Sequence, residues 1–230
     1  WRYPYVTLAF AYRTLNKPDS AIKYYRKSIE VDPRNADAYV DLGHYYFSLS
    51  KGDSAIANYE KALAIEPGNI YAGNNIGWLY FNRKKYADAI RYFKSSILTD
   101  PKFINAYNGL GKSFFELKEY DSARIYYSKA FANYQDKSIV NVYIGNFYRD
   151  LKAYDSAKVY YRLAAALAPD YEEAYNNLGR SSFALKQYDS ARLSYRQALQ
   201  ANPYSAFALI NMGLVFKELK ETDSTYNYFQ

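Results

Sequence analysis

The sequence predicts an all-α fold, a solenoid of antiparallel helix pairs, and three sets of residues repeated every 34 positions predict it. Glycine recurs at Gly43, Gly77, Gly111, Gly145, Gly179 and Gly213. Proline recurs at Pro33, Pro67, Pro101, Pro169 and Pro203. Alanine recurs, with an aromatic ring four residues later each time, at Ala21, Ala55, Ala89, Ala123, Ala157 and Ala191. Because the spacing runs through all 230 residues, residues 1–230 are expected to form one repeat array.

Each repeat is expected to hold a first helix, helix A, and a second helix, helix B. The glycine falls in helix A and the alanine in helix B, so that small residues let the two axes approach and neighbouring rings fill the space beside them. Counting from the glycines gives repeats 2–35, 36–69, 70–103, 104–137, 138–171 and 172–205, with an incomplete repeat 206–230.

The ends of helix B are also marked in the sequence. At its start we expect a carboxylate oxygen that accepts an unpaired backbone N–H, supplied by Asp19, Asp53, Asp121, Asp155 and Asp189. At its end we expect the repeated prolines, because proline cannot continue a helix and biases the residue before it away from helical geometry.

The 30 tyrosines follow the same spacing. They occur in helix A at Tyr12, Tyr46, Tyr80 and Tyr148, and in helix B at Tyr59, Tyr127, Tyr161 and Tyr195. We interpret them as packing residues whose rings fill the core and whose hydroxyls each need one partner.

With these residues the chain resembles the tetratricopeptide repeat family. The second repeat carries the family pattern at Tyr39, Leu42, Gly43, Tyr46, Ala55, Tyr59, Ala62 and Pro67. The chain departs from the pattern at Ala9, Gly73, Gln135 and Asn141. The resemblance covers the whole chain and implies a right-handed superhelical solenoid, in which one helix pair cannot bury its apolar stripe alone and stability comes from stacking.

The composition argues against catalysis and against a bound cofactor. The absence of cysteine excludes thiol nucleophiles, disulfides and thiolate metal sites, and His44 is the only histidine. The sequence shows no pairing of nucleophile and base, no phosphate-binding glycine loop and no cluster of metal ligands. No window approaches the ~20 apolar residues of a membrane helix. We therefore expect a protein that is not an enzyme, with no cofactor, no metal and no membrane insertion.

The resemblance implies a concave face lined by helices A, where extended peptides or partner helices bind. Its outward-facing positions are expected three and two residues before each glycine and one and four after it. Asparagine there can bond the backbone of any extended peptide, and aromatic rings add apolar pockets. The predicted binding residues are Asn74, Asn75, Trp78, Phe81, Asn108, Lys112, Phe115, Asn146, Arg149, Asn176, Asn177, Arg180, Phe183 and Asn211.

A protein or peptide partner follows from this interpretation. Lys112, Arg149 and Arg180 would together favour an acidic segment in that partner. A second basic set, Arg124, Lys158 and Arg192, is expected on the helix-B side, either as a solvated face or as a surface for an acidic partner or RNA. Nucleic acid is not favoured, because a known recognition module and an isolated basic patch are both missing. His44 is interpreted as a groove or surface residue.

Two other functions remain open at this stage. The array can be a structural spacer or assembly arm of a larger complex, such as a bacterial envelope or secretion machine. It can also be the substrate-recruiting arm of an enzyme whose catalytic domain lies outside this chain.

The two ends suggest a piece of a longer chain. The N-terminus, Trp1-Arg2-Tyr3-Pro4, has neither an initiator methionine nor a signal pattern, so the compartment stays open between cytoplasm and periplasm. A last helix B is expected to begin near Asp223 and to stop at Gln230. Such an end would leave an apolar face uncovered and available for self-association.

Overall fold

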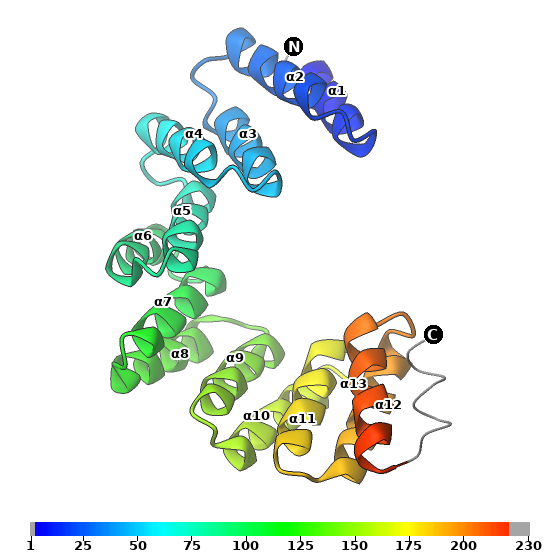
Figure 1. Cartoon of the computed structure of the whole chain (residues 1–230). Helices are drawn as coiled ribbons and strands as arrows, with labels where there is room; N and C mark the ends of the chain where they lie inside the picture. The colour runs from blue at the N-terminus through cyan, green and yellow to red at the C-terminus, as the bar shows by residue number, and fades with distance from the viewer. Residues whose placement is uncertain (1–2, 221–230) are drawn as a thin grey trace. The chain divides into compact units, whose positions relative to one another are not determined.

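The computed structural model describes residues 3–220, and this part contains thirteen α-helices and no strand (Figure 1). The helices group into two compact units, residues 1–118 and 119–230. Each unit is described by itself. The predicted all-α class with antiparallel helix pairs is confirmed, and the expected last helix near Asp223 lies outside the described residues.

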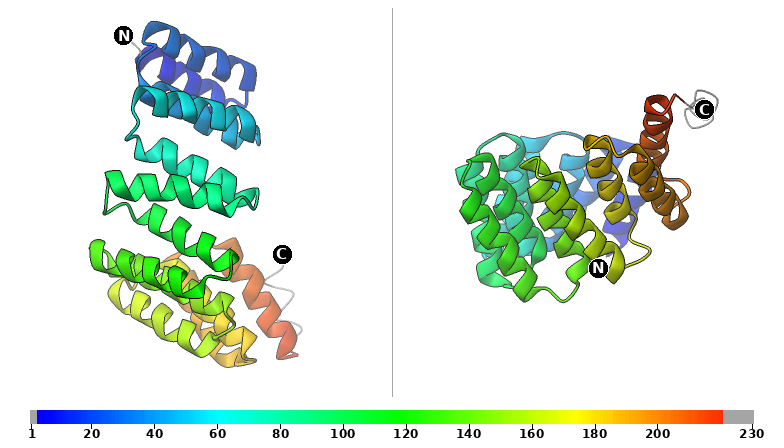
Figure 2. Two further views of the ribbon diagram at one scale, coloured as in Figure 1. Left: turned by 90° about the vertical axis from the view of Figure 1, so that its left-hand side faces the viewer. Right: turned by 90° about the horizontal axis from the view of Figure 1, so that it is seen from below.

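The first unit consists of three helix pairs and one further helix A. Its helices are α1 (Tyr3–Thr14), α2 (Pro18–Val31), α3 (Ala36–Ser48), α4 (Gly52–Ile65), α5 (Ile70–Asn82), α6 (Tyr86–Thr99) and α7 (Ile104–Glu116). Successive helices lie side by side, α1 against α2, α3 against α4 and α5 against α6, and α7 packs against α6 (Figures 1 and 2).

The second unit begins with a helix B and continues in the same order. Its helices are α8 (Tyr120–Asn133), α9 (Lys137–Asp150), α10 (Tyr154–Leu167), α11 (Glu172–Ala184), α12 (Tyr188–Ala201) and α13 (Ala206–Glu218). The pairs α9–α10 and α11–α12 are packed against one another through α10 and α11.

Helix B ends where the prolines predict. The helices α2, α4, α6, α10 and α12 each end two residues before a repeated proline. Helix α8 ends at the same place in its repeat although Gln135 replaces the proline. The tertiary environment therefore ends this helix without help from a proline ring.

The predicted capping by aspartate is wrong in its detail. The aspartates are the second residue of helix B, as at Asp19 and Asp53, and the capping position before the helix is held by residues whose side chains make no cap bond. A carboxylate in the first turn still interacts favourably with the positive end of the helix dipole. Several of these aspartates instead pair with a cation, as Asp53 does with Arg83 Nη2 at 2.7 Å.

Side-chain caps occur on four of the helices A, α3, α5, α9 and α13, whereas α7 and α11 have none. Asn35 Oδ1 accepts from Ala38 N at 3.2 Å, and Asn69 Oδ1 accepts from Ala72 N at 3.0 Å. Ser205 and Asp136 cap α13 and α9 in the same way. Each cap satisfies one of the backbone N–H groups that a helix start leaves unpaired.

The turn between helices A and B has one residue in left-handed geometry in every repeat. These residues have φ between 53 and 63° and are Asn16, Ser50, Lys84, Lys118, Lys152, Lys186 and Lys220. At Lys84 the turn is closed by bonds from Lys85 N to Tyr80 O (2.9 Å) and from Lys84 N to Phe81 O (2.8 Å). This geometry usually carries glycine, because a Cβ is disfavoured there.

Replacing Lys84 by glycine is expected to stabilise the first unit. Relief of the left-handed strain, of the order of 1–2 kcal/mol, outweighs the added freedom of the unfolded chain, so the expected gain is about 0.5–1 kcal/mol. Lys84→Val should destabilise the unit, and Lys85→Ala, next to it at φ −88°, is the control. Urea unfolding followed by circular dichroism measures the difference. A loss of stability in Lys84→Gly would contradict the strain argument.

In the repeats of Gly43, Gly77, Gly145 and Gly179 the core contains a ring packed against this helix-A glycine. A Cβ on Gly43, Gly77 or Gly179 would lie 2.6 Å from the nearest atom of Tyr59, Phe93 or Tyr195 respectively. These rings are at most 1% exposed. Only glycine lets the helix-A backbone come this close, which gives the repeated glycine its physical reason.

Candidate functional site

The predicted binding residues lie on helices A, which neighbour one another in each unit. Helix α5 contacts α7 in the first unit, and α11 contacts both α9 and α13 in the second. The predicted residues of each unit therefore lie on helices that neighbour one another.

Aromatic side chains dominate this face in the first unit. Phe47 is 50% exposed, and Trp78 packs edge-on against Phe81 and Phe93 with centroids 5.4 and 5.3 Å apart. Lys112 Nζ, from α7, lies 5.7 Å from the Trp78 ring centroid. Phe81 and Phe115 are half-buried in the same position of their repeats. The face therefore offers partly exposed rings with a cation beside one of them.

Asn75 and His44 form a polar contact between α5 and α3. Asn75 Nδ2 donates to His44 Nε2 at 2.6 Å, which requires a neutral ring with its proton on Nδ1. The His44 ring also packs edge-on against Tyr59, at 5.6 Å between centroids. Partial burial of the ring lowers the pKa of His44 below its ordinary 6.5.

The imidazole of His44 is expected to titrate with a midpoint below 6.5. Because folding lowers this pKa, the unfolded chain takes up the proton first, and the contribution of neutral His44 to stability is lost as the pH falls below about 6.5. His44 is the only histidine, so an NMR titration of imidazole protons gives one curve. A midpoint at or above 6.5 would contradict a neutral His44 ring that accepts from Asn75.

Some predicted asparagines are buried, which corrects their expected outward orientation. Asn74, Asn176 and Asn177 are 7, 6 and 6% exposed. They lie three and two residues before the glycine, where helix A meets its neighbours, so these side chains pack between helices. The Oδ1 atoms of Asn74, Asn108 and Asn176 are buried, and among the described residues they have no hydrogen-bond partner. A buried acceptor without a partner costs about 1–3 kcal/mol.

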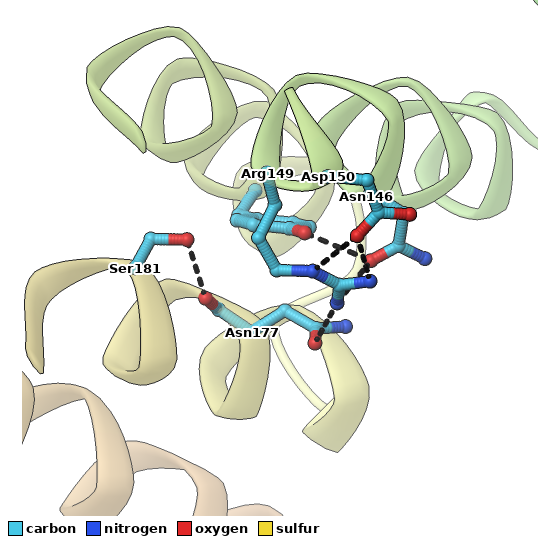
Figure 3. Close-up of polar contacts among 6 residues, drawn as sticks. Asn146, Arg149, Asp150, Asn177 and Ser181 are labelled. Atoms are coloured by element: carbon cyan, nitrogen blue, oxygen red, sulfur yellow. Dashed lines mark hydrogen bonds and ion pairs between the residues drawn. The ribbon is translucent and has the colours of Figure 1, made fainter. Parts of the chain in front are cut away.

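In the second unit Arg149 gathers several predicted residues into one network (Figure 3). Its Nη1 donates to Asn146 Oδ1 at 2.9 Å and to Asn177 Oδ1 at 3.2 Å, which joins α9 to α11. Its Nη2 lies 2.8 Å from Asp150 Oδ1. The Tyr161 hydroxyl, from α10, donates to the same Asn146 oxygen at 2.8 Å. The network fixes the amides of Asn146 and Asn177 in place.

The charge of Arg149 is thus already balanced within the fold. Burial lowers the pKa of Arg149, but Tyr161 and Asp150 outweigh it and the pKa is raised, so the guanidinium stays charged. Because Asp150 neutralises this cation, Arg149 is a support for neighbouring side chains more than a free partner for an acidic ligand.

A pocket of about 530 Å³ opens between α11 and α13. It is lined by the predicted residues Asn176, Asn177 and Arg180 and by Phe207, which sequence reasoning missed. The guanidinium of Arg180 lies 5.5 Å from the Phe207 ring centroid. Three carboxylates, Asp170, Glu172 and Glu173, also line the pocket, so its charge is mixed. Phe207 precedes the glycine of its repeat by six residues, outside the four positions predicted to face the groove.

The two remaining predicted residues lie in the same unit outside this pocket. Phe183 packs edge-on against Tyr188 at 5.4 Å between centroids. Asn211 Nδ2 donates to the backbone oxygen of Phe207 at 2.7 Å, so this amide group is hydrogen-bonded within α13.

The basic set on helices B is paired with aspartates of the same helices. Arg124, Lys158 and Arg192 lie 3.4, 3.8 and 2.7 Å from Asp121, Asp155 and Asp189. Lys158 is 7% exposed and also donates to Gln187 Oε1. Each of these cations is thus offset by a carboxylate of its own helix, and the three do not form a surface of one sign.

Sequence profiles described as "Tetratricopeptide repeat" match residues 6–70, 74–138, 142–171 and 172–205. The chain belongs to the tetratricopeptide repeat family. Tetratricopeptide repeat (TPR) proteins are generally scaffolds for protein–protein interaction and are typically non-catalytic. A search of curated protein sequences gave no match.

Solved structures share the TPR fold at low sequence identity. A tetratricopeptide repeat protein from Parabacteroides merdae ATCC 43184 is similar with a TM-score of 0.73 and 16% identity, over 99% of this chain and 90% of that one. Yeast Tom70 is similar with a TM-score of 0.82 and 16% identity, over 100% of this chain and 50% of that one. Pseudomonas aeruginosa pilF is similar with a TM-score of 0.65 and 22% identity, over 96% of each chain. At these identities the likeness shows the fold.

The helices within residues 3–220 are 12 to 14 residues long. No described helix has the length and apolar character that crossing a membrane demands. Among the same residues, no group of three or more histidine or acidic side chains is arranged to hold a metal ion.

Proposed function

We propose that this TPR chain is a non-catalytic scaffold that binds an extended peptide or a partner helix along the faces lined by helices A. The pocket between α11 and α13 carries the proposal, because three of the predicted residues line it together. Concave, mostly apolar sites with a few fixed polar groups are the usual form of a binding site.

The unpaired amide oxygens supply the polar part of this recognition. Asn176 Oδ1 is buried without a partner in the described part of the chain, and Asn176 lines the pocket. Because this oxygen is buried in the free chain, a backbone N–H of a bound peptide would reach it once the Asn176 side chain turned towards the pocket, and the bond would remove the cost of the orphaned acceptor. Asn108 Oδ1 would accept in the same way on the first unit.

Exposed rings supply the apolar part. Phe207 is 41% exposed at the pocket and Phe47 is 50% exposed on α3. Partly exposed aromatic side chains are the residues that most often carry binding energy. We propose that an acidic side chain in the partner would meet Lys112 or Arg180, since neither of these two cations has an ion pair within the described residues.

A peptide selection tests the proposal with defined ligands. A displayed library of random 12-residue peptides is selected against the chain, and the affinity of enriched peptides is measured by fluorescence anisotropy. For binders of the second unit, Arg180→Ala with Phe207→Ala should weaken binding by about tenfold or more, as hot-spot truncation does. Leu98→Ser, on helix B at 85% exposure, is the matched control and should change nothing.

The first unit has its own reporter. Trp1 and Trp78 are the only tryptophans, so in a Trp1→Phe background the fluorescence of Trp78 reports binding to the α5 face. Peptides that bind this face should shift the Trp78 emission, and Phe47→Ala should weaken their binding. Selected peptides that lose nothing in either set of groove variants would overturn the proposal and favour a structural arm, with its contacts on helices B or at the ends.

A further inference from the structure

One position of helix A carries an aromatic ring in five successive repeats and a serine in the sixth. The third residue after the repeated glycine position is Tyr12, Tyr46, Tyr80, Phe114 and Tyr148, and then Ser182. A position in helix B, fifteen residues after the glycine, follows the same trend with Tyr24, Asn58, Tyr92, Tyr126, Tyr160 and Ser194. Repeat 172–205 is therefore the one complete repeat in which both rings are missing.

Where both tyrosines are present within a unit, they stack on one another. The ring centroids are 5.2 Å apart in Tyr12–Tyr24, 5.6 Å in Tyr80–Tyr92 and 5.3 Å in Tyr148–Tyr160, with the planes within 14° of parallel. The chain thus fills this position with its own phenol rings in three repeats. Two serines supply far less volume, and the same position in repeat 172–205 has room to spare.

A pocket of about 370 Å³ lies beside these two serines, between α10, α11 and α12. Its lining includes Ala165, Tyr175, Leu178, Ser182, Ser194 and Arg162. Leu193, 60% exposed, also lines it. We call this space the serine pocket.

Two polar groups of the serine pocket lack partners. Ser182 is 1% exposed, and its hydroxyl makes no hydrogen bond to any residue that the structure describes. Arg162 likewise has no ion pair or side-chain hydrogen bond within residues 3–220. Ser182 lines the pocket and Arg162 is exposed, so both groups can bond a ligand that enters it.

In two other repeats a cation at the position of Arg162 contacts the ring of the next repeat, whereas two further repeats have Glu60 and Ser128 there. The residue 20 positions before the helix-A ring is Arg26 for Tyr46, Lys94 for Phe114 and Arg162 for Ser182. Arg26 Nη2 donates to the Tyr46 hydroxyl at 3.1 Å, and Lys94 Nζ lies 5.8 Å from the Phe114 ring centroid. In both earlier cases the cation meets the ring of the next repeat. At Arg162 the cation is present and the ring is absent.

The matching pocket of the second repeat shows the difference. It measures about 310 Å³ and contains Tyr46 and Asn58, together with Glu30 and Lys61. In the serine pocket the two charged positions are Ala166 and Gln197, and Tyr46 is replaced by Ser182. The serine pocket is thus less charged, and its ring position is empty of any side chain of the size of tyrosine.

We propose that the serine pocket binds a tyrosine side chain presented by a protein partner. The phenol ring would take the place that the stacked tyrosines occupy in other repeats, against Tyr175 and Leu178. Its hydroxyl would accept from Arg162, as the Tyr46 hydroxyl accepts from Arg26. This site lies on α10, α11 and α12, away from the pocket between α11 and α13, and does not depend on the function proposed above.

The probe for this test is p-cresol, which is the tyrosine side chain without its backbone. When p-cresol is added to the protein labelled at alanine and leucine methyl groups, it should cause saturable NMR shifts at Ala165, Leu178 and Leu193. Toluene, which lacks the hydroxyl, should bind about tenfold or more weakly, the effect of one hydrogen bond to a charged donor. Arg162→Leu should abolish this preference while p-cresol still binds.

Filling the pocket from within provides the second arm. Ser182→Tyr with Ser194→Tyr restores the stacked pair and should abolish the shifts. The matched control is Asn58→Tyr, which completes the pair with Tyr46 in the second repeat and should leave binding at the serine pocket unchanged. Groove-binding peptides should bind the filled variant normally, so the two proposals fail separately.

Three results would overturn the proposal. They are the absence of saturable shifts up to the solubility of p-cresol, shifts that persist in the filled variant, and equal binding of toluene and p-cresol to the unmodified chain. Circular dichroism checks that each variant is folded. If the filled variant is not, the comparison of p-cresol with toluene in Arg162→Leu decides alone.

Discussion

Gly109→Leu is expected to destabilise the first unit by roughly 1–3 kcal/mol or more, through overpacking against one ring. Phe93, on α6, is fully buried between two helix-A glycines, Gly77 of α5 and Gly109 of α7. A Cβ on either glycine would come within 2.6 Å of the Phe93 Cε1 atom, closer than van der Waals contact allows. The ring cannot move away from one glycine without meeting the other.

For Gly109→Ala, helix propensity and the contact with Phe93 predict stability changes of opposite sign. Helix propensity alone predicts a gain of about 1 kcal/mol, because alanine replaces glycine inside a helix. The contact with Phe93 predicts a loss, and we expect the loss to win. Gly73→Ala is the control, because its nearest neighbour is the movable Ser96 hydroxyl at 3.0 Å and the next atom is 3.8 Å away. This substitution should be close to neutral.

Urea unfolding measures these differences with two probes. Circular dichroism follows the helices, and the fluorescence of Trp78, whose ring centroid lies 5.3 Å from that of Phe93, follows the affected contact. Phe93→Leu should relieve the clash, so the double variant with Gly109→Ala should be more stable than the sum of the single effects predicts. A Gly109→Ala chain as stable as Gly73→Ala would contradict the close approach.

The 34-residue spacing was enough to predict the helices, because it records a constraint that every repeat shares. Glycine at Gly77 meets the ring of Phe93, and a proline such as Pro67 follows the end of α4. Such contacts recur at a fixed distance along the chain, so one sequence contains several independent copies of the same signal. Helix pairs and the ends of helix B could therefore be predicted from residues alone.

The site was only partly predictable, because its details depend on which neighbours meet in space. Asn177 has the same residue type and repeat position as Asn75. Yet Asn177 is bonded to Arg149, whereas Asn75 is bonded to His44. The capping role of Asn69 and the left-handed geometry of Lys84 were also missed. Asparagine before helix A is a recognisable cap signal. Lysine at a turn, by contrast, does not predict a positive φ.

Glu172→Ala is expected to destabilise the second unit by about 1–3 kcal/mol, because it removes the acceptor shared by three side chains. The carboxylate accepts from Asn176 Nδ2 at 2.8 Å, from Asn202 Nδ2 at 2.7 Å and from the Ser205 hydroxyl. Ser205 caps α13 and Asn202 ends α12, so one carboxylate at the start of α11 holds the connection to the next repeat.

The same carboxylate gives a stability change with a defined pH range. The Ser205 hydroxyl lowers the pKa of Glu172 below its ordinary 4.5; burial opposes this, and the bonds from Asn202 and Asn176 add to the lowering. A carboxyl whose pKa is lowered by folding stabilises the fold above its unfolded pKa, and this contribution is lost as the pH falls through the folded pKa. The loss is therefore expected below about pH 4.5.

Urea unfolding tests this account. It is measured at pH 7 and at successively lower pH for the unmodified chain, for Glu172→Gln and for Glu173→Gln. Glu173 is exposed and its carboxylate accepts from the Tyr171 hydroxyl at 3.1 Å, so Glu173→Gln is the matched control and should cost little. At pH 7 Glu172→Gln should be clearly less stable than the unmodified chain, because an amide NH₂ would face the donors of Asn202 or Ser205. This difference should shrink as Glu172 becomes protonated below pH 4.5. A difference that stayed constant over that range would mean that Glu172 acts through packing alone and that its charge does not hold the two repeats together.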